Sequence, residues 1–106
     1  MKLGIILHST NAEVVFNAIR LANYSLTEKD EVRLFLMASG VEYENLHSDK
    51  FPIIDLAQSF LEEGGRIMAC GTCLKLRQKD GSELCPLSNM KELYELVRDC
   101  DKTITF

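Results

Sequence analysis

Residues 64–73 read Gly64-Gly65-Arg66-Ile67-Met68-Ala69-Cys70-Gly71-Thr72-Cys73. The glycine pair stops a preceding helix, and the apolar run over residues 66–69, which ends at the first cysteine, is typical of one buried strand. Gly71 permits a tight turn into a short helix, which we expect over residues 72–78. A strand followed directly by a helix is the repeating unit of an α/β protein with a parallel sheet.

The same alternation of strand and helix signals extends from this segment to both ends of the chain. Apolar runs predict further strands over residues 2–7, 31–38 and 101–106. Apolar residues at helical spacing predict three more helices: one over residues 14–26 capped by Ser9, Thr10 or Asn11, one from Pro52 to residue 61, and one opened by Pro86 and Ser88. Residues 41–50 have no clear period and are expected to form a surface loop that can hold a short turn of helix.

These elements predict a single α/β domain over residues 1–106, built as a flavodoxin-like three-layer sandwich around a parallel sheet. Right-handed crossovers with helices on both faces favour the strand order 2-1-3-4. In this order the strand at 2–7 lies between those at 31–38 and 66–69. The loops that follow strands 2–7 and 66–69 would then be neighbours at the carboxyl edge of the sheet, where parallel sheets bind their ligands.

Composition narrows the classes of function. A net charge of −4 argues against a protein that works by neutralising the phosphates of a nucleic acid. No segment approaches the ~20 apolar residues that cross a bilayer, and residues 1–7 lack the features of an export signal. We therefore expect a cytoplasmic protein without a membrane partner, in which the four cysteines are thiols, metal ligands or redox groups.

Cys70 is the main candidate for chemistry. It lies where a parallel strand ends and a helix begins, and unpaired backbone N–H groups favour an anion such as a thiolate there. A cysteine that ends an apolar strand is often a small core residue, but a second thiol at Cys73 favours a chemical role for the pair. Lys75 and Arg77 follow closely and can support a negative charge, although a solvated helix face is the more common meaning of such cations.

The expected site extends to polar residues around the pair. Gly71 and Thr72 belong to its loop, Lys75 follows one turn later, and the neighbouring loop supplies His8, Ser9 and Asn11. His8 can serve as a base or a binding group, or it can simply close its strand with a hydrogen bond. The helix start after Ser9 and Asn11 can hold a small anion, although capping is their commoner role.

Two cysteines in a C-x-x-C arrangement admit dithiol redox chemistry, half of a zinc site, or a persulfide-carrying thiol with a neighbour that resolves it. A zinc site would take Cys70, Cys73 and Cys85 with a fourth ligand from Cys100, His47 or His8. Structural zinc normally needs a second close pair of ligands, which the sequence lacks, so no metal and no cofactor are expected. Cys100 lies between two aspartates that would raise its pKa, and we expect it to be inert.

Residues 1–5, 64–73 and 88–106 resemble the DsrE/DsrF-like family, which includes the TusD-type sulfur-relay subunits. The resemblance implies a flavodoxin-like fold, a cytoplasmic location and homo-oligomers, often trimers or hexamers. It also implies that the cysteine at the end of the third strand, here Cys70, accepts sulfane sulfur from a donor protein as a persulfide and passes it to an acceptor protein. Cys73 and Cys85 are additions that relay subunits do not require.

The sequence therefore predicts a small persulfide carrier, sulfurtransferase-like, with Cys70 as the nucleophile and Cys73 as the resolving thiol. Whether the protein turns over as an enzyme stays open. The alternative is an oligomeric binding or regulatory module of the same fold, in which the cysteines bind zinc or act as a dithiol redox switch.

Overall fold

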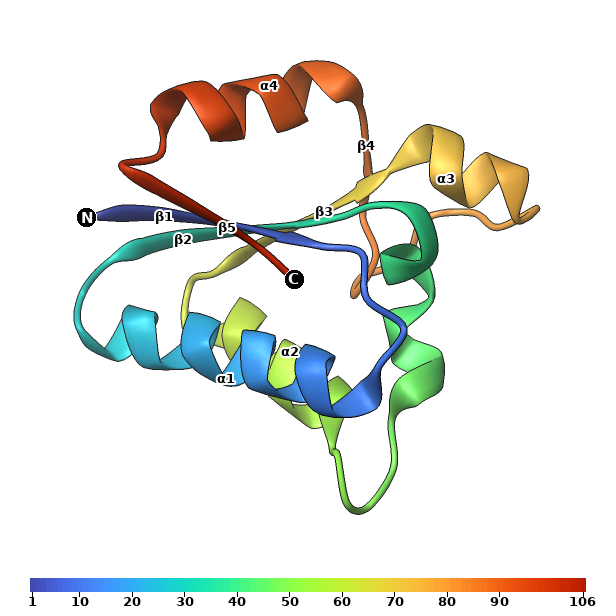
Figure 1. The fold of residues 1–106 in the computed structure, drawn as a ribbon, viewed down its shortest axis with the longest axis horizontal. Coiled ribbons are helices and arrows are strands. Elements are labelled where there is room, and N and C mark those ends of the chain that lie inside the picture. The colour runs from blue at the N-terminus through green and yellow to red at the C-terminus, as the bar shows by residue number, and fades with distance from the viewer.

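The computed structural model describes residues 1–106 and contains one sheet of five parallel strands in the order β4-β3-β2-β1-β5 (Figure 1). The elements along the chain are β1 (Lys2–Leu7), α1 (Ala12–Thr27), β2 (Glu31–Leu36), the 3₁₀ helix η1 (Ala38–Leu46), α2 (Ile53–Glu62), β3 (Arg66–Cys70), α3 (Gly71–Leu76), β4 (Leu87–Ser88), α4 (Met90–Asp99) and β5 (Lys102–Thr105). The predicted flavodoxin-like α/β sandwich is confirmed.

The sheet is covered unequally on its two faces. Helices α1 and α2 lie side by side on one face and α4 lies alone on the other, while α3 extends from the end of β3 (Figure 1). The main core lies between the sheet and the first two helices, whereas the α4 side holds a small cluster of Phe35, Met68 and Leu96. None of the helices combines the length and the apolar character that a membrane span requires.

The predicted strand order 2-1-3-4 is wrong. In the structure β3 pairs with β2, and β5 pairs with the other side of β1. Both orders satisfy the right-handed crossover rule, but 2-1-3-4 would place α1 and α2 on opposite faces. These helices instead pack against each other, and the Asn23 side-chain amide donates to the carbonyl oxygen of Leu56 at 3.1 Å. Two successive right-handed crossovers on one face must advance in the same direction, which places β3 beyond β2.

A two-residue strand precedes the last helix, where the sequence pattern predicts that Pro86 and Ser88 open that helix. The backbone at β4 instead pairs with β3, so the helix starts later. Its cap is Asn89, whose side-chain oxygen accepts the N–H of Glu92 at 3.0 Å. A proline fits the first turn of a helix and the approach to an edge strand equally well, and only the sheet distinguishes the two.

The segment after β2 is more ordered and more buried than the expected surface loop. Strand β2 ends at Leu36 rather than at residue 38, and η1 follows at once. Tyr43 of η1 is fully buried, and its hydroxyl donates to the carbonyl oxygen of Leu84 at 2.5 Å. At the end of the segment, Nδ1 of His47 accepts the N–H of Ile54 at 3.0 Å and satisfies the start of α2.

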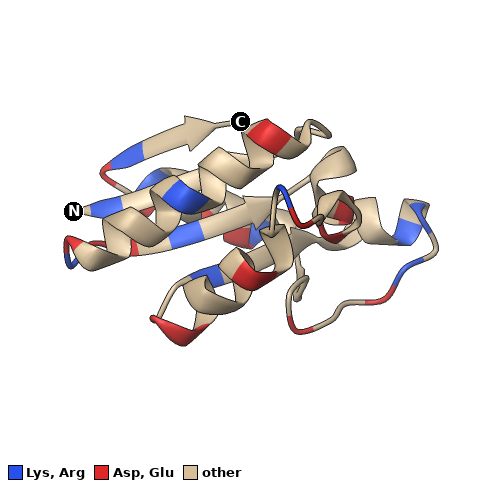
Figure 2. Cartoon of the chain, turned by 90° about the horizontal axis from the view of Figure 1, so that it is seen from below, with Lys and Arg blue, Asp and Glu red and all other residues tan.

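Positions of Lys and Arg alternate with positions of Asp and Glu along the helices, strands and loops of the cartoon in Figure 2. Some ion pairs join neighbours in the chain, whereas Arg66 with Glu92 and Arg77 with Glu42 join separate elements. Arg33 pairs with Glu31 of the same strand at 3.1 Å, and Lys91 pairs with Glu95 one turn along α4 at 3.4 Å. Exposed pairs of this kind contribute little to stability, so burial at the sheet remains the main source of folding free energy.

We predict that Gly40→Ala destabilises the protein by about 3 kcal/mol, because a side chain there has no room. A β-carbon at Gly40 would lie 2.0 Å from the backbone oxygen of Leu7, which cannot move without disturbing β1. Urea unfolding followed by circular dichroism measures the change. Asp49→Ala, at an exposed position nearby, is the control and should change the free energy of unfolding by less than about 0.5 kcal/mol. Equal stability of Gly40→Ala and the wild type would show that η1 does not pack closely on β1.

Candidate functional site

Cys70 is the last residue of β3 and the N-cap of α3. Its Sγ accepts the backbone N–H of Cys73 at 3.4 Å, as a capping side chain does at the start of a helix. The next position requires a glycine because the turn passes close to β4. A β-carbon at Gly71 would lie 2.8 Å from the carbonyl oxygen of Ser88. Cys70 therefore lies where the sequence predicts it, at the junction of a parallel strand and a helix.

Cys73 lies beside Cys70 and has a second neighbour, which the sequence pattern did not indicate. Its Sγ accepts the backbone N–H of Ala38, the first residue of η1, at 3.1 Å. Burial and interaction with the Cys70 thiol raise the pKa of Cys73, while the Ala38 amide and the charge of Arg77 offset part of this effect. Cys73 therefore keeps its proton at neutral pH, which suits a thiol that acts second in a sequence of two.

Arg77 fixes α3 against η1. One guanidinium nitrogen donates to the carbonyl oxygen of Cys73 at 3.2 Å and another to the Ser39 hydroxyl oxygen at 3.4 Å. Its Nε also lies 3.6 Å from a carboxylate oxygen of Glu42. The side chain is about one quarter exposed, so it does not belong to a simple solvated face. Arg77 therefore connects the end of α3 to η1, the two segments that contact Cys73.

A groove of about 760 Å³ opens beside the two thiols. The five residues of this loop and helix that the sequence predicted for the site all line it: Cys70, Gly71, Thr72, Cys73 and Lys75. Its other walls include Met37, which follows β2, Leu87 of β4 and Met90 of α4. The groove thus combines two thiols, an amine and apolar walls, and it can accept a molecule or segment larger than a single sulfur atom.

His8, Ser9 and Asn11 do not line this groove. They follow β1, and β2 lies between that strand and β3, so the expected adjacency of the two loops is wrong. Ser9 Oγ accepts the N–H of Asn11 at 3.0 Å, and the Asn11 side chain accepts the N–H of Val14 at 3.1 Å as the cap of α1. The backbone N–H of His8 donates to the carbonyl oxygen of Phe106 at 2.8 Å. In the structure these three residues stabilise the loop after β1 and the start of α1. They are separated from the thiol pair because β2 lies between β1 and β3.

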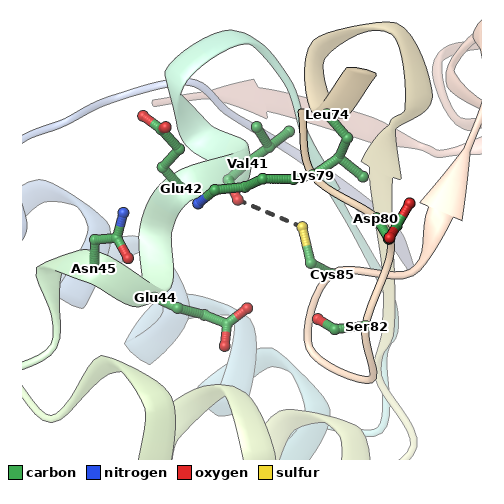
Figure 3. Close-up of a pocket in the computed structure, with 9 residues that line it drawn as sticks. All are labelled: Val41, Glu42, Glu44, Asn45, Leu74, Lys79, Asp80, Ser82 and Cys85. Carbon is green, nitrogen blue, oxygen red and sulfur yellow. Dashed lines mark hydrogen bonds between the residues drawn. The ribbon is translucent and has the colours of Figure 1, made fainter. Parts of the chain in front are cut away.

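Cys85 occupies a separate cavity of about 300 Å³ between η1 and the loop after α3 (Figure 3). The buried thiol donates to the carbonyl oxygen of Val41 at 3.4 Å, and burial raises its pKa to about 11. Glu42 and Glu44 line the same cavity, and Lys79 borders both this cavity and the groove. Cys85 is therefore close to the thiol pair in the fold but does not share its opening.

The set of residues considered for zinc is not assembled. No group of three or more histidine, cysteine, aspartate or glutamate side chains is arranged to hold a metal ion. Cys85 is directed at Val41, and His47 caps α2. Cys100 packs in the cluster beneath α4, where burial, more than its acidic neighbours, raises its pKa. The zinc alternative therefore has no support in the geometry.

Comparison with known proteins finds relatives that match most of the chain. The sequence family described as DsrE/DsrF-like matches residues 1–106. An uncharacterized protein of Methanopyrus kandleri, MK0008, is 32% identical over 100 residues, which are 89% of this chain and 83% of that protein. The uncharacterized protein MJ0989 of Methanocaldococcus jannaschii is 31% identical over 100 residues, covering 89% and 88% of the two chains.

Two solved structures share the fold. The ychN protein of E. coli superposes with a TM-score of 0.87 at 22% identity, covering 100% of this chain and 99% of that one. A protein of unknown function from Bacteroides thetaiotaomicron, BT1422, has a TM-score of 0.78 at 20% identity, covering 99% and 94%. At these identities the likeness establishes the architecture and leaves the chemistry to be argued from the thiols.

We predict that Cys85 is alkylated far more slowly than Cys70 at pH 7.5. A pKa of about 11, against an ordinary 9.0, lowers its thiolate fraction about a hundredfold, and burial adds to the effect. Peptide mapping after timed exposure to N-ethylmaleimide measures both rates, and the Cys85 rate should keep rising with pH up to about 11. Equal rates for the two cysteines at pH 7.5 would contradict this difference in environment.

Proposed function

Because the chain belongs to the DsrE/DsrF-like family over residues 1–106, we propose that it is a small cytoplasmic persulfide carrier that holds sulfane sulfur on Cys70. The observation that carries the proposal is the position of this thiol. Cys70 Sγ lies at the start of α3, accepts an amide N–H at 3.4 Å and borders a groove that Cys73 also lines. A thiolate and a perthiolate are both anions, and the amide stabilises either one.

Loading the carrier needs a donor that contains sulfane sulfur. The Cys70 thiolate attacks the outer sulfur of a donor persulfide R–S–SH, a new sulfur–sulfur bond forms, and R–S⁻ leaves with the electron pair of the broken bond. Transfer reverses these roles, because an acceptor thiolate attacks the outer sulfur and Cys70 leaves as the thiolate. Donor and acceptor proteins are therefore the partners that this chemistry requires, and the groove of about 760 Å³ is large enough for their reacting segments.

Cys73 provides a second route for the bound sulfur. Its thiolate can attack the inner sulfur of the Cys70 persulfide, forming the Cys70–Cys73 disulfide and releasing HS⁻. The raised pKa of Cys73 keeps this route slow at neutral pH, so that the persulfide can persist until an acceptor arrives. A dithiol redox switch, the alternative on the same residues, would close the same disulfide without carrying sulfur.

We predict that reduced protein incubated with a sulfane-sulfur donor gains one sulfur, about 32 Da in the intact mass, and that Cys70→Ser abolishes the gain. Cys73→Ser should retain or increase it, because the resolving thiol is absent. Cys100→Ser is the matched control and should behave as the wild type, since this residue lies beneath α4 away from the groove. A loss of about 2 Da without any gain of sulfur would favour the redox switch, and a gain that survives Cys70→Ser would overturn the assignment.

We further propose that the protein is a homo-oligomer whose contact includes the outer face of α4. Met90, Tyr94 and Val97 form a stripe along that helix, each more than half exposed, and Leu87 extends it toward the groove. An apolar surface of this kind is commonly covered by another protein surface. Trimers and hexamers are the assemblies that the family resemblance leads us to expect, and contact at this stripe would place the thiol pair near a subunit boundary.

We predict that Tyr94→Glu weakens self-association, because it places a charge in the apolar stripe. Sedimentation velocity over a range of concentrations should show the wild type as an oligomer and the variant shifted toward the monomer. Tyr24→Glu on α1 is a matched control, since the two tyrosines are 63% and 62% exposed at positions 24 and 94, and it should leave the distribution unchanged. A monomeric wild type, or equal effects of both variants, would contradict a contact on α4.

A further inference from the structure

Ala38 has a backbone conformation that an alanine rarely adopts. Its φ angle is +50°, in the left-handed region, and it is the first residue of η1, two positions after the end of β2. A residue with a β-carbon is strained there and keeps that conformation only where surrounding contacts impose it. One such contact is the hydrogen bond of 3.1 Å from its backbone N–H to Cys73 Sγ.

We propose that Cys73 is a redox latch, which holds η1 closed over the Cys85 cavity when reduced and releases it when the Cys70–Cys73 disulfide forms. The latch uses the thiol pair of the proposed carrier and rests on that function for its natural oxidant, the sulfane sulfur on Cys70. The latch couples the oxidation state of Cys70 and Cys73 to the accessibility of the Cys85 cavity.

In the reduced state two polar connections join Cys73 to the start of η1, and the ion pair of Arg77 with Glu42 reaches further along it. The first is the hydrogen bond from Ala38 to Cys73 Sγ, and the second runs through Arg77, which reaches both the Cys73 carbonyl oxygen and the Ser39 hydroxyl. Both connections contact Cys73 at one end and the first two residues of η1 at the other. The start of η1 therefore depends on where Cys73 lies.

Disulfide formation removes the first connection. A sulfur–sulfur bond of about 2.05 Å draws Cys73 Sγ toward Cys70 and away from the Ala38 amide. In the natural reaction the Cys73 sulfur is oxidised, the bond between the two persulfide sulfurs breaks, and the outer sulfur leaves as HS⁻ with the electron pair. The Cys73 proton goes to solvent, and a dithiol reductant restores both thiols. Without its acceptor, the strained Ala38 can return to an ordinary conformation.

The movement is confined to the first half of η1. Tyr43 anchors the second half, because it is fully buried and donates to the Leu84 carbonyl oxygen, and the backbone departs from helical geometry at Glu42 just before it. Val41 precedes this anchor, and although its side chain is buried, its carbonyl oxygen accepts the Cys85 thiol across the cavity (Figure 3). Release of Ala38 should thus loosen the wall that covers Cys85.

The chain's own cysteines report this movement. The reduced wild type is compared with protein oxidised by diamide, with the Cys70–Cys73 disulfide verified by peptide mapping, and the rate of Cys85 alkylation by N-ethylmaleimide is measured in each. Loss of one hydrogen bond from the closed state should raise the Cys85 rate about fivefold. Cys100, which packs beneath α4, is the internal control and should change by less than about twofold.

Two variants test the latch without any oxidant. Reduced Cys73→Ala lacks the acceptor and should show the same rise in Cys85 alkylation as the oxidised wild type, whereas Cys73→Ser keeps an acceptor oxygen and should stay near the reduced rate. A complete disulfide with an unchanged Cys85 rate, an unchanged rate in Cys73→Ala, or a parallel rise of Cys85 and Cys100 would each overturn the proposal. Diamide replaces sulfane sulfur here, so a failure of persulfide loading and a failure of the latch give different results.

Discussion

The packing of α1 against α2 on one face of the sheet is the constraint on which the rest of the structure depends. Two right-handed crossovers on the same face advance in one direction, so β3 must lie beyond β2. The carboxyl ends of these two strands then meet, and Cys73, which follows β3, receives the amide of Ala38, which follows β2. Every feature of the thiol site that involves η1 follows from this adjacency.

The two thiols have different environments although they lie in one short segment. Cys70 caps the helix and borders the groove, whereas burial and the neighbouring thiol raise the pKa of Cys73. A half-buried capping thiol beside a partner of raised pKa is an arrangement that favours ordered chemistry, in which Cys70 reacts first and Cys73 second. Lys75 adds a positive charge on the groove wall without pairing the thiols directly.

The groove shares lining residues with both the Cys85 cavity and the exposed apolar stripe of α4. Lys79 borders both hollows, and Met90 belongs both to the groove and to the exposed apolar stripe. The sheet face under α1 and α2 has a large core, but the α4 face has a small one. The groove that holds the thiol pair therefore adjoins an apolar stripe that the chain itself leaves exposed.

The sequence by itself determined four of the five strands, the four α-helices, the parallel α/β class and the position of Cys70 where a strand meets a helix, but neither β4 nor η1. The spacing of apolar residues and the turn residues indicate local backbone structure, and each of these elements depends on a short segment of the chain. Only the tertiary structure decided the strand order, the separation of His8 from the thiols, and the contact between Ala38 and Cys73, which lie 35 residues apart. Both strand orders bury the same apolar runs with crossovers of the same hand, so the choice between them rests on how whole helices pack, which no local pattern encodes.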